Sequence, residues 1–162
     1  MLTRRQNLPS ALHSSENIAV LLVSLHGEDE AVLREMLPST YPMASLSRCD
    51  GLEQAMPQIR ETQPAVVICE RDLPGGSWKA VLGTCEALAR PPVVLVVSRH
   101  ADENLWAEVL NLGGYDVLLK PFERSEVSRV IASACRQWCG STPRLPVASV
   151  VTAPPSLTAQ FA

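Results

Sequence analysis

The sequence has few aromatic residues and no excess of basic ones, and both features exclude classes of function. It contains three tryptophans, two tyrosines and two phenylalanines among 162 residues. No basic stripe with interleaved aromatic side chains is present, which argues against direct binding of nucleic acid. The net charge of −3 is too small to indicate a nucleic acid or a membrane as partner. The N-terminal segment has no continuous apolar run, so we predict neither a signal peptide nor a membrane span there.

The cysteines and histidines form no metal-binding pattern. Five cysteines, an odd number in a chain of this size, favour reduced thiols and a cytoplasmic location. Cys135 and Cys139 are four residues apart, but a structural metal site would need two more ligands nearby. The three histidines, His13, His26 and His100, are scattered along the chain. We therefore interpret the cysteines as buried or bystander thiols and predict no metal site.

The composition is that of one globular domain with flexible ends. Hydrophobic residues make up 46% of the chain and charged residues 19%, which is typical of a folded domain with a real core. We assign this domain to residues 18–138. Residues 1–17 are predicted to be a flexible lead, and residues 139–162, rich in Pro, Ser, Thr and Ala, a flexible tail.

Within the domain, apolar runs alternate with segments of helical spacing. Runs without polar alternation are typical of strands covered on both faces, as in a parallel sheet. They predict strands over residues 18–23, 65–69, 93–97 and 115–119, with a weaker strand near 44–47 between the first two. Helices are predicted over 29–37, 52–59, 78–89 and 123–138. A further helix is predicted between Asp102, which caps its start, and Gly113, which ends it. The elements therefore form five consecutive β-strand–α-helix units. This order predicts an α/β fold with a doubly wound, parallel, five-stranded sheet.

In such a sheet the ligand crevice lies beyond the carboxyl ends of the strands. No glycine-rich phosphate loop follows the first strand, which disfavours a nucleotide site. The predicted crevice instead collects a carboxylate, a hydroxyl and an ammonium group. Its side chains are Ser24 and Leu25 after the first strand, Glu70 and Asp72 after the third, Ser98 at the end of the fourth, and Lys120 after the fifth.

Three segments, PAVVICERDLPGG, VVLVVS and LGGYDVLLKPF, resemble the receiver domains of two-component response regulators. The resemblance implies the flavodoxin-like receiver fold. It places Glu70 where the family has its phospho-accepting aspartate and Ser98 where it has a Ser or Thr that hydrogen-bonds the phosphoryl group. Lys120 stands at the family's lysine and is followed by the cis-favouring Pro121. Val117 stands at the aromatic switch position.

The chain departs from the family at the magnesium ligands. Ser24 and Leu25 stand where the family has an acidic pair, and a leucine side chain offers no oxygen to Mg²⁺. We therefore expect no cofactor, and at most weak Mg²⁺ binding. Glu28, Asp29 and Asp72 could rebuild a weak cation site, but we interpret them as acids at a helix start and a turn residue.

Glu70 itself is longer than an aspartate by about one methylene group, a displacement large enough to matter for phosphoryl transfer. We predict that Glu70 pairs with Lys120 without any phosphate. The resulting interpretation is a pseudo-receiver, a stand-alone signalling module that is not an enzyme and is not phosphorylated in the usual way. The hydroxyl group of Ser98 is expected to form a hydrogen bond with nearby backbone.

Such a module would act by binding a protein, either a histidine kinase, an output protein or a second copy. Helix 103–112 is expected to turn Leu105, Val109 and Leu112 towards the sheet. Trp106 follows Leu105 by one position and Leu110 follows Val109 by one position, so this second pair is displaced by about 100° around the helix axis. Trp106 and Leu110 are predicted to form a partner surface.

Two alternatives remain at this point. One is a working receiver phosphorylated on Glu70 or Asp72. The other, from a different class, is a small α/β enzyme or nucleotide binder that uses the same crevice; no nucleophile elbow or metal cluster supports it.

Overall fold

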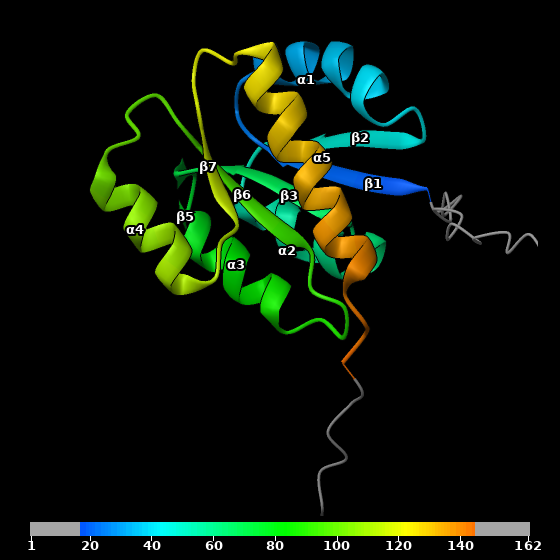
Figure 1. Ribbon diagram of the computed structural model, residues 1–162. Helices are drawn as coiled ribbons and strands as arrows, with labels where there is room; N and C mark the ends of the chain where they lie inside the picture. Colours follow the sequence, from blue (N-terminus) through cyan, green and yellow to red (C-terminus); the bar gives the residue numbers. More distant parts are fainter. Residues whose placement is uncertain (1–16, 145–162) are drawn as a thin grey trace, which may run out of the picture.

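The computed structural model describes residues 17–144 and contains a parallel sheet between two layers of helices (Figure 1). The sheet order is β2-β1-β3-β6-β7, and every neighbouring pair is parallel. Our predictions of a flexible lead over 1–17 and a flexible tail over 139–162 fall largely outside the described residues. The strands of the sheet are β1 (Ile18–Val23), β2 (Ala44–Cys49), β3 (Val66–Glu70), β6 (Val93–Ser98) and β7 (Asp116–Leu119).

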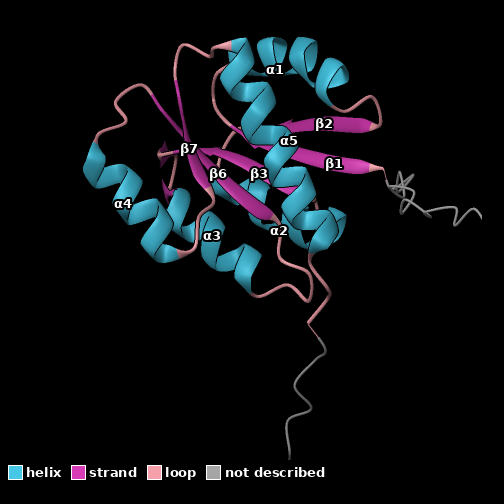
Figure 2. Cartoon of the chain, in the orientation of Figure 1, coloured by secondary structure: helices cyan, strands magenta, loops and turns pink. Residues whose placement is uncertain are grey.

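The predicted α/β fold with five parallel strands and five helices is confirmed (Figure 2). The strand with the weakest sequence signal is β2. It is the second strand along the chain but lies at the edge of the sheet, next to β1. Its residues alternate between exposed and partly buried, which explains its weak signal. The helices are α1 (Gly27–Thr40), α2 (Leu52–Thr62), α3 (Trp78–Glu86), α4 (Glu103–Leu112) and α5 (Arg124–Gly140).

The central strands are buried on both faces because a separate apolar core lies against each face. Helices α1 and α5 cover one face, where Leu22, Ile68 and Leu118 are buried. Helices α2, α3 and α4 cover the other, where Trp78 is 1% exposed. At about 25 cal/mol per Å² of apolar surface, these two cores supply most of the driving force that fixes the strand ends in space.

Local signals at the helix ends behave as predicted. The Asp102 carboxylate accepts a hydrogen bond from the Leu105 N–H at 2.8 Å and so caps α4. Gly113 ends that helix with a φ of 100°, a left-handed conformation that favours glycine. After β3, a short antiparallel hairpin leads the chain to α3. Its two strands, β4 (Asp72–Leu73) and β5 (Gly76–Ser77), have two residues each. Gly75, with a φ of 86°, makes its turn possible.

Helix α4 contradicts one expectation. Leu105 and Val109 face the sheet and are buried, but Leu112 is 46% exposed. Leu112 lies in the last turn of α4, which packs mainly against β7, the edge strand of the sheet.

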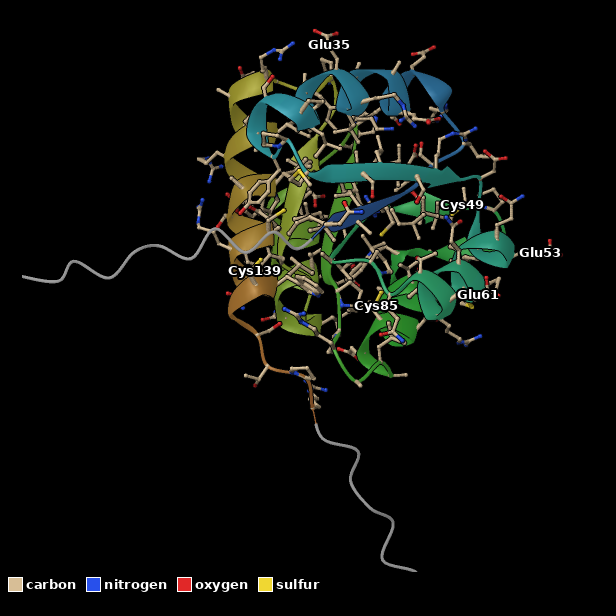
Figure 3. All side chains as sticks on the ribbon, turned by 90° about the vertical axis from the view of Figure 1, so that its right-hand side faces the viewer. Glu35, Cys49, Glu53, Glu61, Cys85 and Cys139 are labelled. Atoms are coloured by element: carbon tan, nitrogen blue, oxygen red, sulfur yellow. The ribbon has the colours of Figure 1, made fainter. Side chains whose placement is uncertain are left out.

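The five cysteines are free thiols, and all but Cys139 are buried. Figure 3 labels three of them, Cys49, Cys85 and Cys139. Burial raises the pKa of Cys49 and of Cys135 to about 11, which keeps both thiols protonated and unreactive. Among the described residues, no group of three or more His, Cys, Asp or Glu side chains could hold a metal ion. No helix in this part of the chain is long and apolar enough to cross a membrane.

Candidate functional site

Four side chains from four segments meet beyond the carboxyl ends of the strands. Ser24 directly follows β1, Asp29 lies in the first turn of α1, Glu70 ends β3 and Lys120 directly follows β7. They come together because β1 and β3 are hydrogen-bonded neighbours and all strands of the sheet run the same way. We call these four residues the crevice cluster.

The polar atoms of the crevice cluster form a closed ring of four. The Lys120 Nζ donates to Glu70 Oε1 at 2.8 Å and also to Asp29 Oδ2. On the opposite side, the Ser24 Oγ lies 2.6 Å from Glu70 Oε1 and 2.9 Å from Asp29 Oδ2. One oxygen of each carboxylate is thus bridged from one side by an ammonium group and from the other by a hydroxyl.

The cluster is shielded from solvent. Ser24 is fully buried, and the side chains of Lys120, Asp29 and Glu70 are 8%, 12% and 19% exposed. Shielding strengthens the attraction between charges, because less water screens them, and makes an unpaired charge costly. The Lys120–Pro121 peptide bond is cis, as the resemblance implied.

Ser24 has a single hydroxyl proton, so it can donate to only one carboxylate at a time. Its oxygen also accepts the backbone N–H of His26 at 3.0 Å. The His26 ring is peripheral, with Nε2 3.7 Å from Glu70 Oε1 and about half of its side chain exposed. The ammonium of Lys120 is therefore the one group that bonds both carboxylates simultaneously.

The pKa of Glu70 reflects these contacts. Burial acts to raise the pKa, but the hydrogen bonds from Lys120 and Ser24, with the positive charge of Lys120, outweigh it. The pKa of Glu70 therefore lies below its ordinary value. Glu70 is a carboxylate at neutral pH, and its ionised form is the one that the fold stabilises.

The structure brings some of the predicted crevice residues together and separates others. The predicted contact between Glu70 and Lys120 is confirmed. Ser98 uses its hydroxyl oxygen to accept the His100 N–H at 3.1 Å, so it bonds local backbone as we expected. The Asp72 side chain is 89% exposed because the β4–β5 hairpin carries it out of the crevice, and within residues 17–144 its one ion pair is with Arg71, at 4.0 Å.

Leu25 also lies outside the ring. Its side chain is 55% exposed and borders a different hollow, with Leu52, Met56 and Pro74. Ser24 and Leu25 follow β1 directly, and Ser24 is fully buried whereas Leu25 faces the surface. Neither Leu25 nor Asp72 contributes an atom to the crevice cluster.

Our interpretation of Asp29 as an ordinary acid at a helix start is wrong. Asp29 is buried and bonds both Lys120 and Ser24. The sequence held a signal for this position: Asp29 precedes Leu33, Met36 and Leu37 at spacings of four, seven and eight, so it begins the buried face of α1. A carboxylate in such a stripe requires an internal partner.

The cluster does not fit Mg²⁺. That ion prefers octahedral coordination by hard oxygen ligands. Here the two carboxylate oxygens that face each other already bond the Lys120 ammonium, and Leu25 supplies no ligand. Of the other two acids in the first turn of α1, Glu28 is exposed and Glu30 pairs with Arg34 and Arg48.

A comparison with protein families identifies the class. The family model of the response regulator receiver domain matches residues 20–132 of this chain. The chain therefore belongs to the response regulator receiver domain family and is a signalling module of two-component systems.

Individual relatives agree with this assignment. The response regulator protein FleR of Pseudomonas aeruginosa is 30% identical over 132 residues, which are 80% of this chain and 27% of FleR. The transcriptional regulatory protein FixJ of Bradyrhizobium diazoefficiens is 27% identical over 112 residues, 68% of this chain and 55% of FixJ. The chain thus spans about half or less of the length of these curated relatives.

Solved receiver domains share the fold. A signal receiver domain from Vibrio parahaemolyticus superimposes with a TM-score of 0.70 at 18% identity, covering 76% of this chain and 94% of that one. The receiver domain of the sensor histidine kinase PA1611 from Pseudomonas aeruginosa gives 0.61 at 21% identity, covering 78% of this chain and all of that one. The PA1611 domain was solved with a magnesium ion coordinated in its active site cleft.

The first prediction concerns the ammonium group. Replacing Lys120 by Met removes the charge and leaves two shielded carboxylates without a cation. We expect a loss of about 2–4 kcal/mol in the free energy of unfolding, between the cost of an unsatisfied polar group and that of a broken buried ion pair. Urea denaturation at pH 7 measures it. The matched control is Lys79→Met, which removes an exposed partner of Glu108 and should change stability little. Equal effects of the two substitutions would contradict the prediction.

The second prediction concerns pH. Because the pKa of Glu70 is lowered in the folded state, its ionised form contributes stability that is present above the unfolded pKa, about 4.5. That contribution disappears as the pH falls through the lower folded pKa. Glu70→Gln should therefore be less stable than the wild type at pH 7, and the difference should shrink below about pH 4.5. Urea denaturation from pH 7 to pH 3 tests this, with the exposed Glu61→Gln as control. A difference that stays constant with pH would contradict it.

Proposed function

We propose that this receiver domain is a pseudo-receiver, which signals by binding a protein rather than by cycling a phosphoryl group on and off. The observation that carries the proposal is the bond of Lys120 to both Glu70 and Asp29. Phosphoryl transfer depends on positioning and on neutralising the charge of the transferred group. In this crevice the ammonium is already used by two carboxylates.

The geometry of Glu70 points the same way. Its Oε1, the oxygen in the ring, accepts from Ser24 and from Lys120, so its lone pairs are engaged. The relative that coordinates magnesium does so in its active site cleft, whereas the equivalent region here does not fit that ion. An acceptor carboxylate already bonded to Lys120, together with a crevice that does not fit magnesium, disfavours phosphoryl transfer to Glu70.

The alternatives have less support. Phosphorylation of Asp72 would occur on an exposed side chain outside the crevice cluster, since the Lys120 ammonium bonds Asp29 and Glu70 instead. A phosphoryl group on Glu70 would have to share the Lys120 ammonium with Asp29. An enzymatic or nucleotide-binding role lacks both a phosphate loop in the sequence and a metal cluster in the described residues.

The proposed partner surface lies on α4 and the strand that it packs against. Trp106 is 38% exposed and Leu110 51%, and Leu112 and Leu119 extend the apolar surface at 46% and 44%. Four of the six exposed large hydrophobic residues in the described part of the chain lie on these two elements. We call these four residues the α4–β7 face. Clustering of this kind, with a tryptophan included, is typical of protein interfaces.

The partner would be a histidine kinase, an output protein or a second copy of the chain. FixJ is a transcriptional regulatory protein and FleR a response regulator, and both are considerably longer than the region matched here. Neither direct nucleic-acid binding nor membrane binding forms part of the proposal, since the net charge is only −3.

The third prediction tests phosphorylation. The full chain, incubated with acetyl phosphate and Mg²⁺, should gain no phosphoryl mass by intact mass spectrometry. Glu70→Asp alone should also gain none, because the metal ligands would still be missing. Combining Ser24→Asp, Leu25→Asp and Glu70→Asp should produce a phosphorylated species. A phosphoryl adduct on the wild type that is lost in Glu70→Gln would overturn the proposed function.

The fourth prediction tests the α4–β7 face. Trp106→Ala should lower the melting temperature modestly, because part of the ring is buried, but should leave the fold intact and weaken association. Light scattering measures self-association, and pull-down from the native host measures binding of another protein. Met43→Ala, which truncates an exposed residue outside this face, is the matched control. Unchanged association, or loss of the fold in Trp106→Ala, would refute this role.

A further inference from the structure

A second hollow lies at the end of the sheet opposite to the crevice. It measures about 420 Å³, and its walls come from residues 91–94, 113–115, 137–138, 141–142 and 144. Strands β6 and β7 begin here and reach the crevice only at their carboxyl ends, so the length of β6 separates the two places by about 20 Å. No residue of the crevice cluster lines this space, which we call the basal hollow.

The walls of the basal hollow are largely apolar. Pro91 and Pro92 line it just before β6, Tyr115 lines it just before β7, and Trp138 lines it near the end of α5. A hollow of this volume, with apolar and aromatic walls and a few polar groups, is typical of sites for small molecules.

Both aromatic rings are held in place. The Arg90 guanidinium stacks on the Trp138 ring at 3.4 Å from its centroid, and the Arg90 Nη2 donates to the Trp138 carbonyl at 3.1 Å. The Tyr115 hydroxyl is hydrogen-bonded to the Ser133 hydroxyl of α5. Two planar groups are thus fixed beside the hollow, which favours a ligand with a planar apolar body.

The turn between α4 and β7 leaves its border of the hollow without side chains at two positions, Gly113 and Gly114. A Cβ at Gly114 would lie 2.5 Å from the Val109 Cγ1, so larger residues are excluded there by the packing of α4. The space between this turn and the end of α5 is therefore not filled from this side.

Two hydrogen-bond donors at the basal hollow have no acceptor among residues 17–144. The Trp138 indole N–H is buried and makes no hydrogen bond with these residues. A buried donor without an acceptor is unfavourable, so an acceptor that a ligand brings to this group would be stabilised. The Arg144 guanidinium is exposed and pairs with no acidic side chain of the same range. Its forked N–H groups match the two oxygens of a carboxylate.

Charge selects the kind of acceptor. Arg144 is the one charged side chain among the described residues that line the hollow. One acid, Glu86, lies beside Gly113 at the same border, and the Arg90 guanidinium on the Trp138 ring offsets it. An anionic ligand therefore fits this end of the domain better than a neutral or a cationic one.

We propose that the basal hollow is a binding site for a small aromatic carboxylate. The ring of the ligand packs against Pro92, Tyr115 and Trp138. Its carboxylate accepts hydrogen bonds from the Arg144 guanidinium and the Trp138 indole N–H. The site is separate from the crevice, so the inference does not depend on whether Glu70 accepts a phosphoryl group.

The test is a titration of the full ¹⁵N-labelled chain with 3-phenylpropionate at pH 7, followed by heteronuclear correlation NMR. The three tryptophans give three indole N–H signals, and the one missing from Trp138→Phe belongs to Trp138. We expect this signal and the backbone signals of Gly113 and Gly114 to shift saturably, with a dissociation constant of about 1–5 mM for so small a ligand. The signals of Ser24 and Glu70 should not move.

Matched probes test the two parts of the ligand. 3-Phenylpropionamide keeps the ring but not the charge and should bind about fivefold more weakly, the scale of an exposed ion pair. Acetate keeps the charge but not the ring and should give no saturable shift.

Matched variants test the two donors. Arg144→Gln should weaken binding of 3-phenylpropionate by about fivefold. Trp138→Phe keeps a ring for Arg90 to stack on and removes the indole N–H, and should weaken binding by about the same factor, read from the signals of Gly113 and Gly114. Arg60→Gln, which removes an exposed arginine of α2, should leave the affinity unchanged.

Several outcomes would overturn the inference. They are no saturable shift at Trp138, Gly113 and Gly114 up to about 20 mM probe, shifts centred on the crevice instead, and equal binding of the acid and its amide. Arg144 is exposed, so Arg144→Gln should keep the fold, and an unchanged affinity in this variant would also refute the site. None of these results bears on the pseudo-receiver proposal, which the search for a phosphoryl adduct decides separately.

Discussion

The contact of one ammonium group with two carboxylates is the constraint on which the crevice depends. Lys120 joins the end of β7 to α1 through Asp29 and to β3 through Glu70. A shielded ion pair of this kind contributes little net stability relative to an apolar replacement, because desolvation offsets the attraction. Loss of one partner is nevertheless costly, since the remaining charges stay shielded and unpaired. The network therefore acts mainly to select one arrangement of these three segments.

The scaffold makes this selection possible. Strands β1 and β3 are buried on both faces, which leaves them little freedom to shift register. Their carboxyl ends consequently deliver Ser24 and Glu70 to fixed positions next to each other. The extra methylene group of a glutamate at position 70, compared with an aspartate, extends the carboxylate outwards from the strand end. In this crevice the additional reach ends in hydrogen bonds to Ser24 and Lys120 instead of an open position for a phosphoryl donor.

The fold and the central contact could be predicted from sequence because both follow from periodic patterns. Unbroken apolar runs located the strands, and parallel strands bring Glu70 and Lys120 to the same edge of the sheet. Asp29 was misjudged because an acid in the first turn of a helix has a common local explanation, interaction with the helix dipole. Only its place on the buried face of α1 distinguishes it. Asp72 was misplaced for the opposite reason. It is close to Glu70 in sequence, but the short β4–β5 hairpin directs its side chain towards solvent.

The side chains at the crevice are consistent with one another electrostatically. Ser24 and Leu25, which the sequence resemblance places at the family's acidic pair, carry no charge, so neither adds a carboxylate to this region. Asp29 restores one carboxylate from the neighbouring helix. A single ammonium can hold two carboxylates together, whereas additional acids at positions 24 and 25 would leave repulsion that only a divalent ion could offset. The uncharged residues at positions 24 and 25, the carboxylate of Asp29 and the bridging position of Lys120 therefore depend on one another, because one ammonium group can hold two carboxylates together but not four.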